Sequence, residues 1–284
     1  MHIKTYYYLT KPGIIYGNAI TATGGFFLAS KGNFDVLLFL ATLIGLSLVI
    51  ASACVFNNYI DRGIDEKMAR TKNRALVKKL ISPFNALAYG TVLGLIGFLV
   101  LFFHTNLLAT LLGATGFFFY VVVYGIYKRK SIYGTLVGSI SGAIPPVVGY
   151  CAVSNNFDIG AIIFFIILVL WQMPHFYAIA IYRYKDYANA SIPVLPIKKG
   201  IHTTKVHMLF YITAFIIAST ALTTFGLTGY IYLVVMSLLG LKWLLLAVKG
   251  FTTEDDGRWA RKMFSFSLIV ITALCVLISV DAVR

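Results

Sequence analysis

Nine apolar stretches, each about 20 residues long, constrain the fold of this chain more than any other feature of the sequence. Each stretch is long enough to cross the hydrocarbon core of a bilayer as an α-helix. The composition agrees, because 59% of the residues are apolar, 12% are charged and the mean hydropathy is +0.84, whereas soluble domains carry about 25% charged residues. The sequence therefore predicts an all-α polytopic membrane protein, a single domain over residues 1–284, with transmembrane helices at 13–29, 35–56, 84–103, 107–127, 134–153, 159–182, 206–225, 228–248 and 264–281.

The first stretch, 13–29, is rich in glycine and carries the polar residues Asn18, Thr21 and Thr23. It lacks the small-residue cleavage site that follows the apolar region of a signal peptide. We therefore expect it to form the first of nine spans. The chain also lacks an Arg- and Ser-rich N-terminal extension, which favours a prokaryotic plasma membrane over an organelle.

The basic residues predict the orientation, since short loops that carry Lys and Arg stay in the cytoplasm. With the N-terminus inside, 21 of the 24 Lys and Arg residues fall on the inner side. The outer side keeps Lys31 and Arg284, and Lys242 lies within the eighth span. An odd number of spans places the C-terminus outside.

The net charge of +14 follows mostly from this inward bias, so we expect no nucleic-acid partner. The three cysteines, Cys54, Cys151 and Cys275, all lie within expected spans and form no CxxC or Cys/His pattern. They are interpreted as small buried residues rather than metal ligands.

Asn57, Asp61 and Asp65 follow one another at intervals of four residues, at the inner end of the second apolar stretch. Side chains spaced by four residues stay on one face of an α-helix. Mg²⁺ prefers such oxygen ligands, and it usually takes one or two carboxylates together with water and substrate phosphate oxygens. The row therefore predicts a site for a metal ion and a diphosphate at the cytoplasmic face, and Arg62, Lys67 and Arg70 add charges that suit a polyanion. Charged residues at helix ends can also be ordinary solvated loops.

A second polar segment follows the sixth stretch, four spans later, and it contains Tyr182, Arg183, Lys185 and Asp186. This spacing suggests two related halves whose acidic ends converge, although no residue-level repeat supports it.

The segment 57–76 resembles the NxxxDxxxD region of the UbiA superfamily of intramembrane prenyltransferases, and in particular its haem O synthase branch. The stretches 9–18, 142–150 and 171–196 resemble that branch in the same order, so the likeness extends over most of the chain. The first motif is general to the superfamily, whereas the stretch from Trp171 onward is specific to the branch.

This resemblance implies a nine-helix bundle with a central cavity that opens to the cytoplasmic face and the membrane. It implies transfer of a farnesyl group from farnesyl diphosphate to the 2-vinyl group of haem b, with addition of water, giving haem O and diphosphate. Asn57, Asp61 and Asp65 would hold Mg²⁺, and Asp186 would complete the catalytic set. The expected diphosphate ligands are Arg62, Lys67, Arg70, Lys128 and Arg129.

The second motif departs from the superfamily pattern, because Tyr182 stands where many members have the first Asp of a DxxxD pair and Asp186 is the single carboxylate. Tyr182 and Lys185 are candidates for substrate positioning, although Tyr182 can also be an interfacial anchor. His175 is the candidate haem ligand, with Arg183 beside the haem. A histidine bonded to a neighbouring helix is the plain structural alternative for His175. A later haem A synthase and haem-copper oxidase assembly proteins are possible partners.

Three other functions remain open from the residues. A transporter would also have many spans, but its ionisable groups would lie near the midplane instead of at one face. Prenylation of an aromatic acid or quinone precursor would leave the stretch around Trp171 and His175 unexplained. A nonenzymatic assembly factor would leave the row at Asp61 unexplained.

Overall fold

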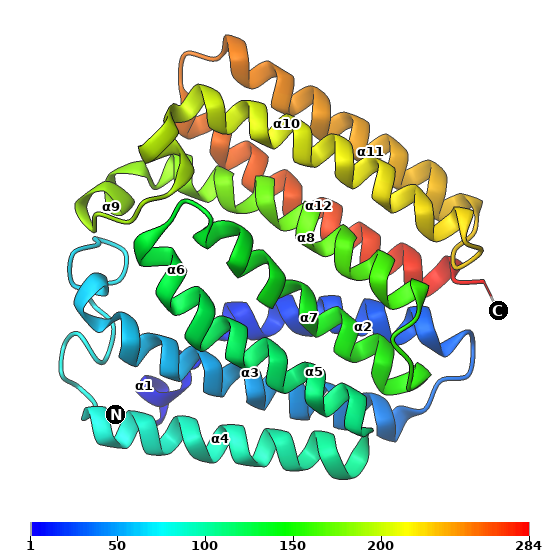
Figure 1. Cartoon of the computed structure of the whole chain (residues 1–284), viewed down its shortest axis with the longest axis horizontal. Helices are drawn as coiled ribbons and strands as arrows, with labels where there is room; N and C mark the ends of the chain where they lie inside the picture. Colours follow the sequence, from blue (N-terminus) through cyan, green and yellow to red (C-terminus); the bar gives the residue numbers. More distant parts are fainter. Residues whose placement is uncertain (1, 284) are drawn as a thin grey trace.

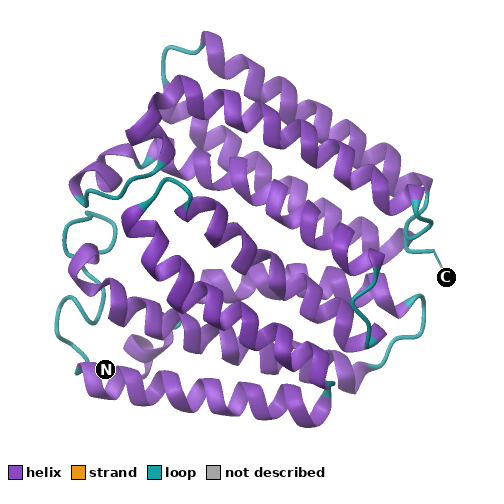
Figure 2. Cartoon of the chain, in the orientation of Figure 1, coloured by secondary structure: helices purple, strands orange, loops and turns teal. Residues whose placement is uncertain are grey.

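The computed structural model describes residues 2–283, and every regular element in this range is a helix (Figures 1 and 2). Arg284, expected on the outer side, lies outside the described residues. In chain order the elements are α1 (His2–Leu9), α2 (Pro12–Ser30), α3 (Val36–Asp65), α4 (Pro83–His104), α5 (Leu107–Phe118), the π-helix η1 (Phe119–Val123), α6 (Tyr124–Lys130), α7 (Gly134–Ser154), α8 (Ile159–Tyr182), α9 (Tyr184–Asn189), α10 (Leu195–Thr224), α11 (Tyr230–Val248), the 3₁₀ turn η2 (Lys249–Thr252) and α12 (Asp256–Asp281).

Eight of the nine expected stretches lie in helices that are long and apolar enough to cross a membrane. Helices α5, η1 and α6 join into one such segment, Leu107–Lys130, and the segment that begins with α11 runs over Tyr230–Thr252. The stretch at 13–29 also forms a helix, α2, but it is not among the eight. Its four glycines and its polar residues lower its hydropathy.

Polar caps fix where the long helices begin. Asp35 accepts hydrogen bonds from the backbone N–H groups of Leu37 and Leu38, and Asp158 does the same for Gly160 and Ala161. Helix α3 continues through Asp65 and does not end at residue 56, so the whole row from Asn57 to Asp65 lies on one helix.

Helices α2 and α7 approach each other closely at two glycines. A Cβ atom built on Gly149 would lie 2.1 Å from the carbonyl oxygen of Ala22, and one on Gly25 would lie 1.9 Å from that of Pro146. Small residues of this kind let helix backbones pack closely inside a membrane. Helix α7 also packs against α5 and α8, so it forms a buried centre of the bundle.

The polar segments gather at one end of the bundle. Helix α9, the loop 66–82 and α1 lie together on the left in Figure 1, and Figure 2 shows most of the longer connections at this end. At the opposite end, Thr228 pairs with Ala282, so the turn before α11 meets the end of α12. The two segments that follow α3 and α8 are therefore brought to the same face, as the sequence predicts.

Candidate functional site

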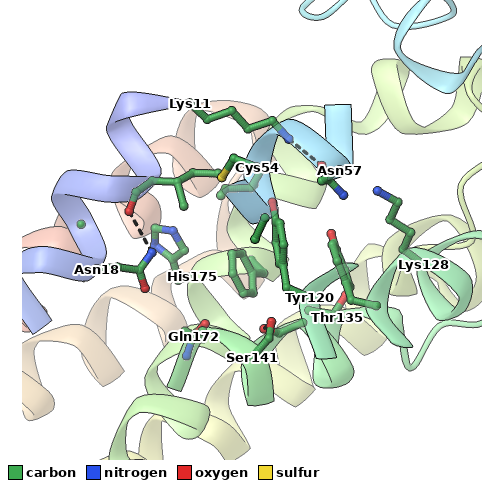
Figure 3. Close-up of a pocket in the computed structure, with 18 of the residues that line it drawn as sticks. Lys11, Asn18, Cys54, Asn57, Tyr120, Lys128, Thr135, Ser141, Gln172 and His175 are labelled. Atoms are coloured by element: carbon green, nitrogen blue, oxygen red, sulfur yellow. Dashed lines mark hydrogen bonds between the residues drawn. The ribbon is translucent and has the colours of Figure 1, made fainter. Parts of the chain in front are cut away.

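A cavity of about 590 Å³ lies between α2, α3, the α5–α6 segment, α7 and α8. Lys11, Asn57 and Lys128 lie together at one side of the cavity in Figure 3, while Gln172 and Ser141 lie at another. Apolar side chains cover much of the remaining wall, among them Leu46, Val49, Ile50, Phe117, Ile144 and Leu168. The space therefore combines a charged end with an apolar body.

The Asn57, Asp61 and Asp65 side chains all face this cavity and are buried. Asp61 pairs with Lys128 from α6 and, at 3.2 Å, with Nη2 of Arg129. Asp65 accepts a hydrogen bond of 2.6 Å from Nη1 of Arg74. Helix periodicity puts the three residues on one face, and cations from other segments converge on that face.

Positive charge exceeds negative charge among the described residues that line the cavity. Four of these side chains are cationic, namely Lys11, Arg70, Arg74 and Lys128, and two are acidic, namely Asp61 and Asp65. Within residues 2–283, no group of three or more His, Cys, Asp or Glu side chains is placed to hold a metal ion. The arrangement thus suits a polyanion, and a hard cation would need oxygen ligands from that anion.

Lys11 enters the site from the segment between α1 and α2. Its backbone has φ 54° and ψ 66°, the left-handed conformation that non-glycine residues seldom adopt. In this conformation its Nζ donates to Oδ1 of Asn57 at 2.5 Å. Burial lowers the pKa of Lys11 to about 8, so its charge is sensitive to mildly alkaline pH.

Asn57 retains one free donor at the cavity. Its Nδ2 is buried and has no hydrogen-bond partner among the described residues, while its Oδ1 accepts from Lys11. An unpaired buried N–H is costly, and an anion placed in the cavity would remove that cost.

Asp186 links the two polar segments and does not line the cavity. Its Oδ1 accepts a hydrogen bond of 3.2 Å from the backbone N–H of Ala69, which belongs to the loop after α3. Its neighbour Tyr187 does line the cavity, and burial raises the pKa of Tyr187, so its hydroxyl stays protonated.

His175 lies on the α8 wall of the cavity (Figure 3), and its ring is held by neighbours on α8 and α12. The ring stacks on Trp171 with centroids 4.8 Å apart, and its Nδ1 lies 2.7 Å from Oγ of Ser267. Because the Ser267 hydroxyl donates to the carbonyl of Phe264, it is left to accept from Nδ1–H. The unprotonated nitrogen is then Nε2.

The structure brings six of the expected site residues to the cavity wall and leaves seven outside it. The six are Asn57, Asp61, Asp65, Arg70, Lys128 and His175. The seven are Arg62, Lys67, Arg129, Tyr182, Arg183, Lys185 and Asp186.

Three of these outside residues have other contacts. Arg62 lies over the ring of Tyr59 at 4.2 Å, and Arg129 reaches Asp61 from outside the cavity lining. The ring of Tyr182 lies 5.3 Å from the guanidinium carbon of Arg183 and 5.9 Å from that of Arg261. The substrate-positioning role expected for Tyr182 therefore gains no support from its position outside the cavity lining.

Sequence reasoning missed several polar residues that line the cavity, namely Lys11, Arg74, Tyr120, Tyr124 and Gln172. Lys11 and Arg74 lie in the stretches that carry the family resemblance, which was the available signal. Tyr120 and Tyr124 stack with centroids 5.7 Å apart beside the π-helical turn η1. Such turns often occur at functional sites, but the apolar sequence gives no sign of this one.

Comparison with known proteins places the chain in a family. The model described as "UbiA prenyltransferase family" matches residues 18–269. Two curated relatives bear the name protoheme IX farnesyltransferase: one from Serratia proteamaculans is 58% identical over 98% of this chain and 95% of its own length, and one from Salmonella choleraesuis is 58% identical over 99% and 95%.

Solved structures share the fold at low sequence identity. One is described as a digeranylgeranylglyceryl phosphate synthase and has a TM-score of 0.80 at 19% identity, covering 98% of both chains. Another is a UbiA homolog from Archaeoglobus fulgidus bound to GPP and Mg²⁺, with a TM-score of 0.68 at 16% identity, covering 97% of this chain and 99% of the other. The sequence and structural matches together show that this chain belongs to the UbiA prenyltransferase family.

Proposed function

We propose that this protein is a membrane-embedded protoheme IX farnesyltransferase, which joins the farnesyl group of farnesyl diphosphate to the 2-vinyl group of haem b, with addition of water, and releases haem O and diphosphate. The observation that carries the proposal is a single cavity that joins a cation-rich end to an apolar body with His175 on its wall. The relatives at 58% identity, which bear this name, support the choice of substrates.

The charged end of the cavity is suited to the diphosphate. Lys11, Arg70, Arg74 and Lys128 supply positive charge, and the free Nδ2 of Asn57 supplies a neutral donor. Breaking the bond between C1 of the farnesyl group and the diphosphate oxygen leaves negative charge on the diphosphate. Fixed cations at this end stabilise that charge as it develops.

The oxygen atoms of this row also fit Mg²⁺, if the ion arrives together with the diphosphate. The carboxylates of Asp61 and Asp65 and the amide oxygen of Asn57 would hold the ion, with phosphate oxygens as further ligands. When bound, Mg²⁺ would neutralise part of the diphosphate charge and favour its departure. The cations now paired with the carboxylates would then be available to the diphosphate.

His175 is suited to an axial contact with haem iron. Its Nδ1 is engaged by Ser267 and its ring lies against Trp171 and Phe264, so the ring orientation is fixed. The lone pair of Nε2 is then free for the metal.

We propose that α2 also crosses the membrane, as the first of nine spans. Lys11, just before α2, touches Asn57 at the inner end of α3, and Asp35 begins α3 at the other end. Its 19 residues span about 28 Å, which is close to the thickness of the hydrocarbon core.

With nine spans and the polar end in the cytoplasm, the N-terminus is inside, the C-terminus is outside, and the cavity opens toward the cytoplasmic face of a prokaryotic plasma membrane. This orientation follows from the positions of the Lys and Arg residues. The product would pass to a haem A synthase or to haem-copper oxidase assembly proteins.

The test is to incubate the purified full-length protein in detergent with haem b, farnesyl diphosphate and Mg²⁺, and to analyse the haems by mass spectrometry. We expect metal-dependent haem O from the wild type, and its loss in Asp61→Ala. Lys31→Ala, at the opposite end of the bundle, serves as the matched control. If the wild type prenylates an aromatic acid and leaves haem unchanged, the proposed acceptor is wrong.

A further inference from the structure

Gln172 lines the cavity, and its Oε1 accepts no hydrogen bond from the part of the chain that the structure describes. Gln172 lies on α8, one turn from His175, and only 4% of its surface is exposed. Its Nε2 donates to the carbonyl oxygens of Ser139 at 3.1 Å and Leu168 at 3.0 Å. Because these two bonds consume both hydrogens of the amide, the orientation of the amide is fixed and Oε1 is the atom left over.

The surroundings of Oε1 contain acceptors and few donors. A Cβ atom on Gly142 would lie 2.1 Å from Oε1, so this glycine leaves the space that the oxygen occupies. Pro145 and Pro146 have no N–H, so the carbonyls of Ser141 and Gly142 lose their α-helical donors. The Ser141 hydroxyl donates to the carbonyl of Gly138 and can accept in return. Ser141, Gly142 and Gln172 all line the cavity.

A purely structural role for Gln172 explains the contacts of its amide nitrogen but not the position of its amide oxygen. The bond from Nε2 to Ser139 ties α8 to α7, and that tie accounts for the amide nitrogen. It does not account for a polar oxygen that faces a largely apolar cavity, where an unpaired acceptor is costly. Figure 3 shows this oxygen on the side of Gln172 that points into the cavity.

We propose that Gln172, with Ser141, positions the water molecule that adds to the substrate. A water molecule that donates both hydrogens to protein acceptors keeps its oxygen lone pairs turned toward the cavity, which is the orientation of a nucleophile. The inference rests on the proposed function, because it concerns the fate of the cation formed on the vinyl group.

The vinyl π electrons form a bond to C1 of the farnesyl group as the bond from C1 to the diphosphate breaks, and the carbon attached to the porphyrin becomes cationic. The oxygen of the positioned water forms a bond to that carbon, and one proton of this water is released to solvent, so the products are haem O, diphosphate and one proton. Without the water, the cation instead loses a proton from the adjacent carbon and gives an alkene that is lighter than haem O by one water molecule.

The experiment measures the ratio of this dehydrated haem to haem O for the full-length enzyme, with haem b, farnesyl diphosphate and Mg²⁺. We expect Gln172→Leu to raise the ratio about tenfold, the effect of losing one hydrogen bond to the reacting water. Gly142→Ala should do the same, because its methyl group displaces Oε1. Ser219→Ala, which removes a buried hydroxyl on α10 outside the cavity lining, should leave the ratio unchanged.

Gln172→Glu keeps an acceptor oxygen and should restore haem O as the main product, which a merely structural role would not require. An unchanged ratio in Gln172→Leu overturns the proposal. If Gln172→Leu does not fold, an unchanged ratio in Gly142→Ala overturns it instead. A wild type that makes no farnesylated haem contradicts the proposed function, whereas haem O formation with unaltered ratios contradicts only the role of Gln172.

Discussion

The ammonium nitrogen of Lys11 lies 2.5 Å from Oδ1 of Asn57, although the two residues are 46 positions apart. This contact ties the segment before α2 to the inner end of α3. It also engages Oδ1 of the Asn57 amide and leaves its buried Nδ2 without a partner among the described residues. Lys11 therefore serves both as a source of positive charge and as a positioning group for Asn57.

We expect Lys11→Ala to raise the KM for farnesyl diphosphate about 10- to 100-fold, since a hydrogen bond to a charged group contributes about 1.5–3 kcal/mol. Steady-state kinetics at pH 7 with saturating haem will measure the change. Lys4→Ala is the control, because Lys4 is exposed on α1 and does not line this cavity. An unchanged KM would show that Lys11 does not contact the diphosphate.

The decline of kcat/KM for farnesyl diphosphate at alkaline pH should also depend on Lys11. Its pKa is lowered to about 8, so the ammonium is charged below pH 8 and neutral above it. The contribution of Lys11 to kcat/KM for farnesyl diphosphate is thus present at pH 7 and lost as the pH rises through 8. Lys11→Arg keeps its charge and should move this decline to higher pH. Identical pH profiles of kcat/KM for the wild type and Lys11→Arg would assign the decline to another group.

Arg74 neutralises Asp65, whose side chain is only 3% exposed. Arg74→Met should lower the free energy of unfolding by about 3 kcal/mol, because it leaves an unpaired buried carboxylate. Adding Asp65→Asn should recover part of the loss, and thermal unfolding in detergent will show it. Equal losses in the single and the double variant would mean that the unpaired carboxylate is not the cause of the loss.

His175→Ala should weaken the binding of haem b about tenfold or more and change its absorption spectrum, because the axial nitrogen is lost. Ser267→Ala should have a smaller effect in the same direction, since the ring then loses the contact that selects its tautomer. His104→Ala, exposed at the end of α4, is the matched control. A haem spectrum unaffected by His175→Ala would leave His175 with a packing role only.

Gly149→Ala should destabilise the contact between α2 and α7. The added methyl group would lie 2.1 Å from the carbonyl oxygen of Ala22, and overpacking of this kind costs about 1–3 kcal/mol. The melting temperature should fall by several degrees. Gly63→Ala meets nothing within 4 Å and should leave the melting temperature unchanged or raise it. Equal melting temperatures for both variants would show that the two helices can separate.

The sequence determined the all-α membrane architecture, because hydrocarbon thickness and helix rise set the length of an apolar span. It also determined the face shared by Asn57, Asp61 and Asp65, since helix periodicity is local. The weakly apolar helix α2 gives the faintest signal of a span, because Gly25 packs against α7 and Gly24 against Cys275 of α12 rather than against lipid.

Only the tertiary structure decided which cations turn inward. Arg62, in the last turn of α3, and Lys67, in the loop that follows, are close in sequence to Arg70 and Arg74, yet only the latter two line the cavity. Lys11, Lys128 and Gln172 reach the cavity from the segment before α2, from α6 and from α8, so their meeting depends on how these elements pack. Sequence spacing cannot encode such contacts, because side-chain direction between distant segments is set by the packing of the whole bundle.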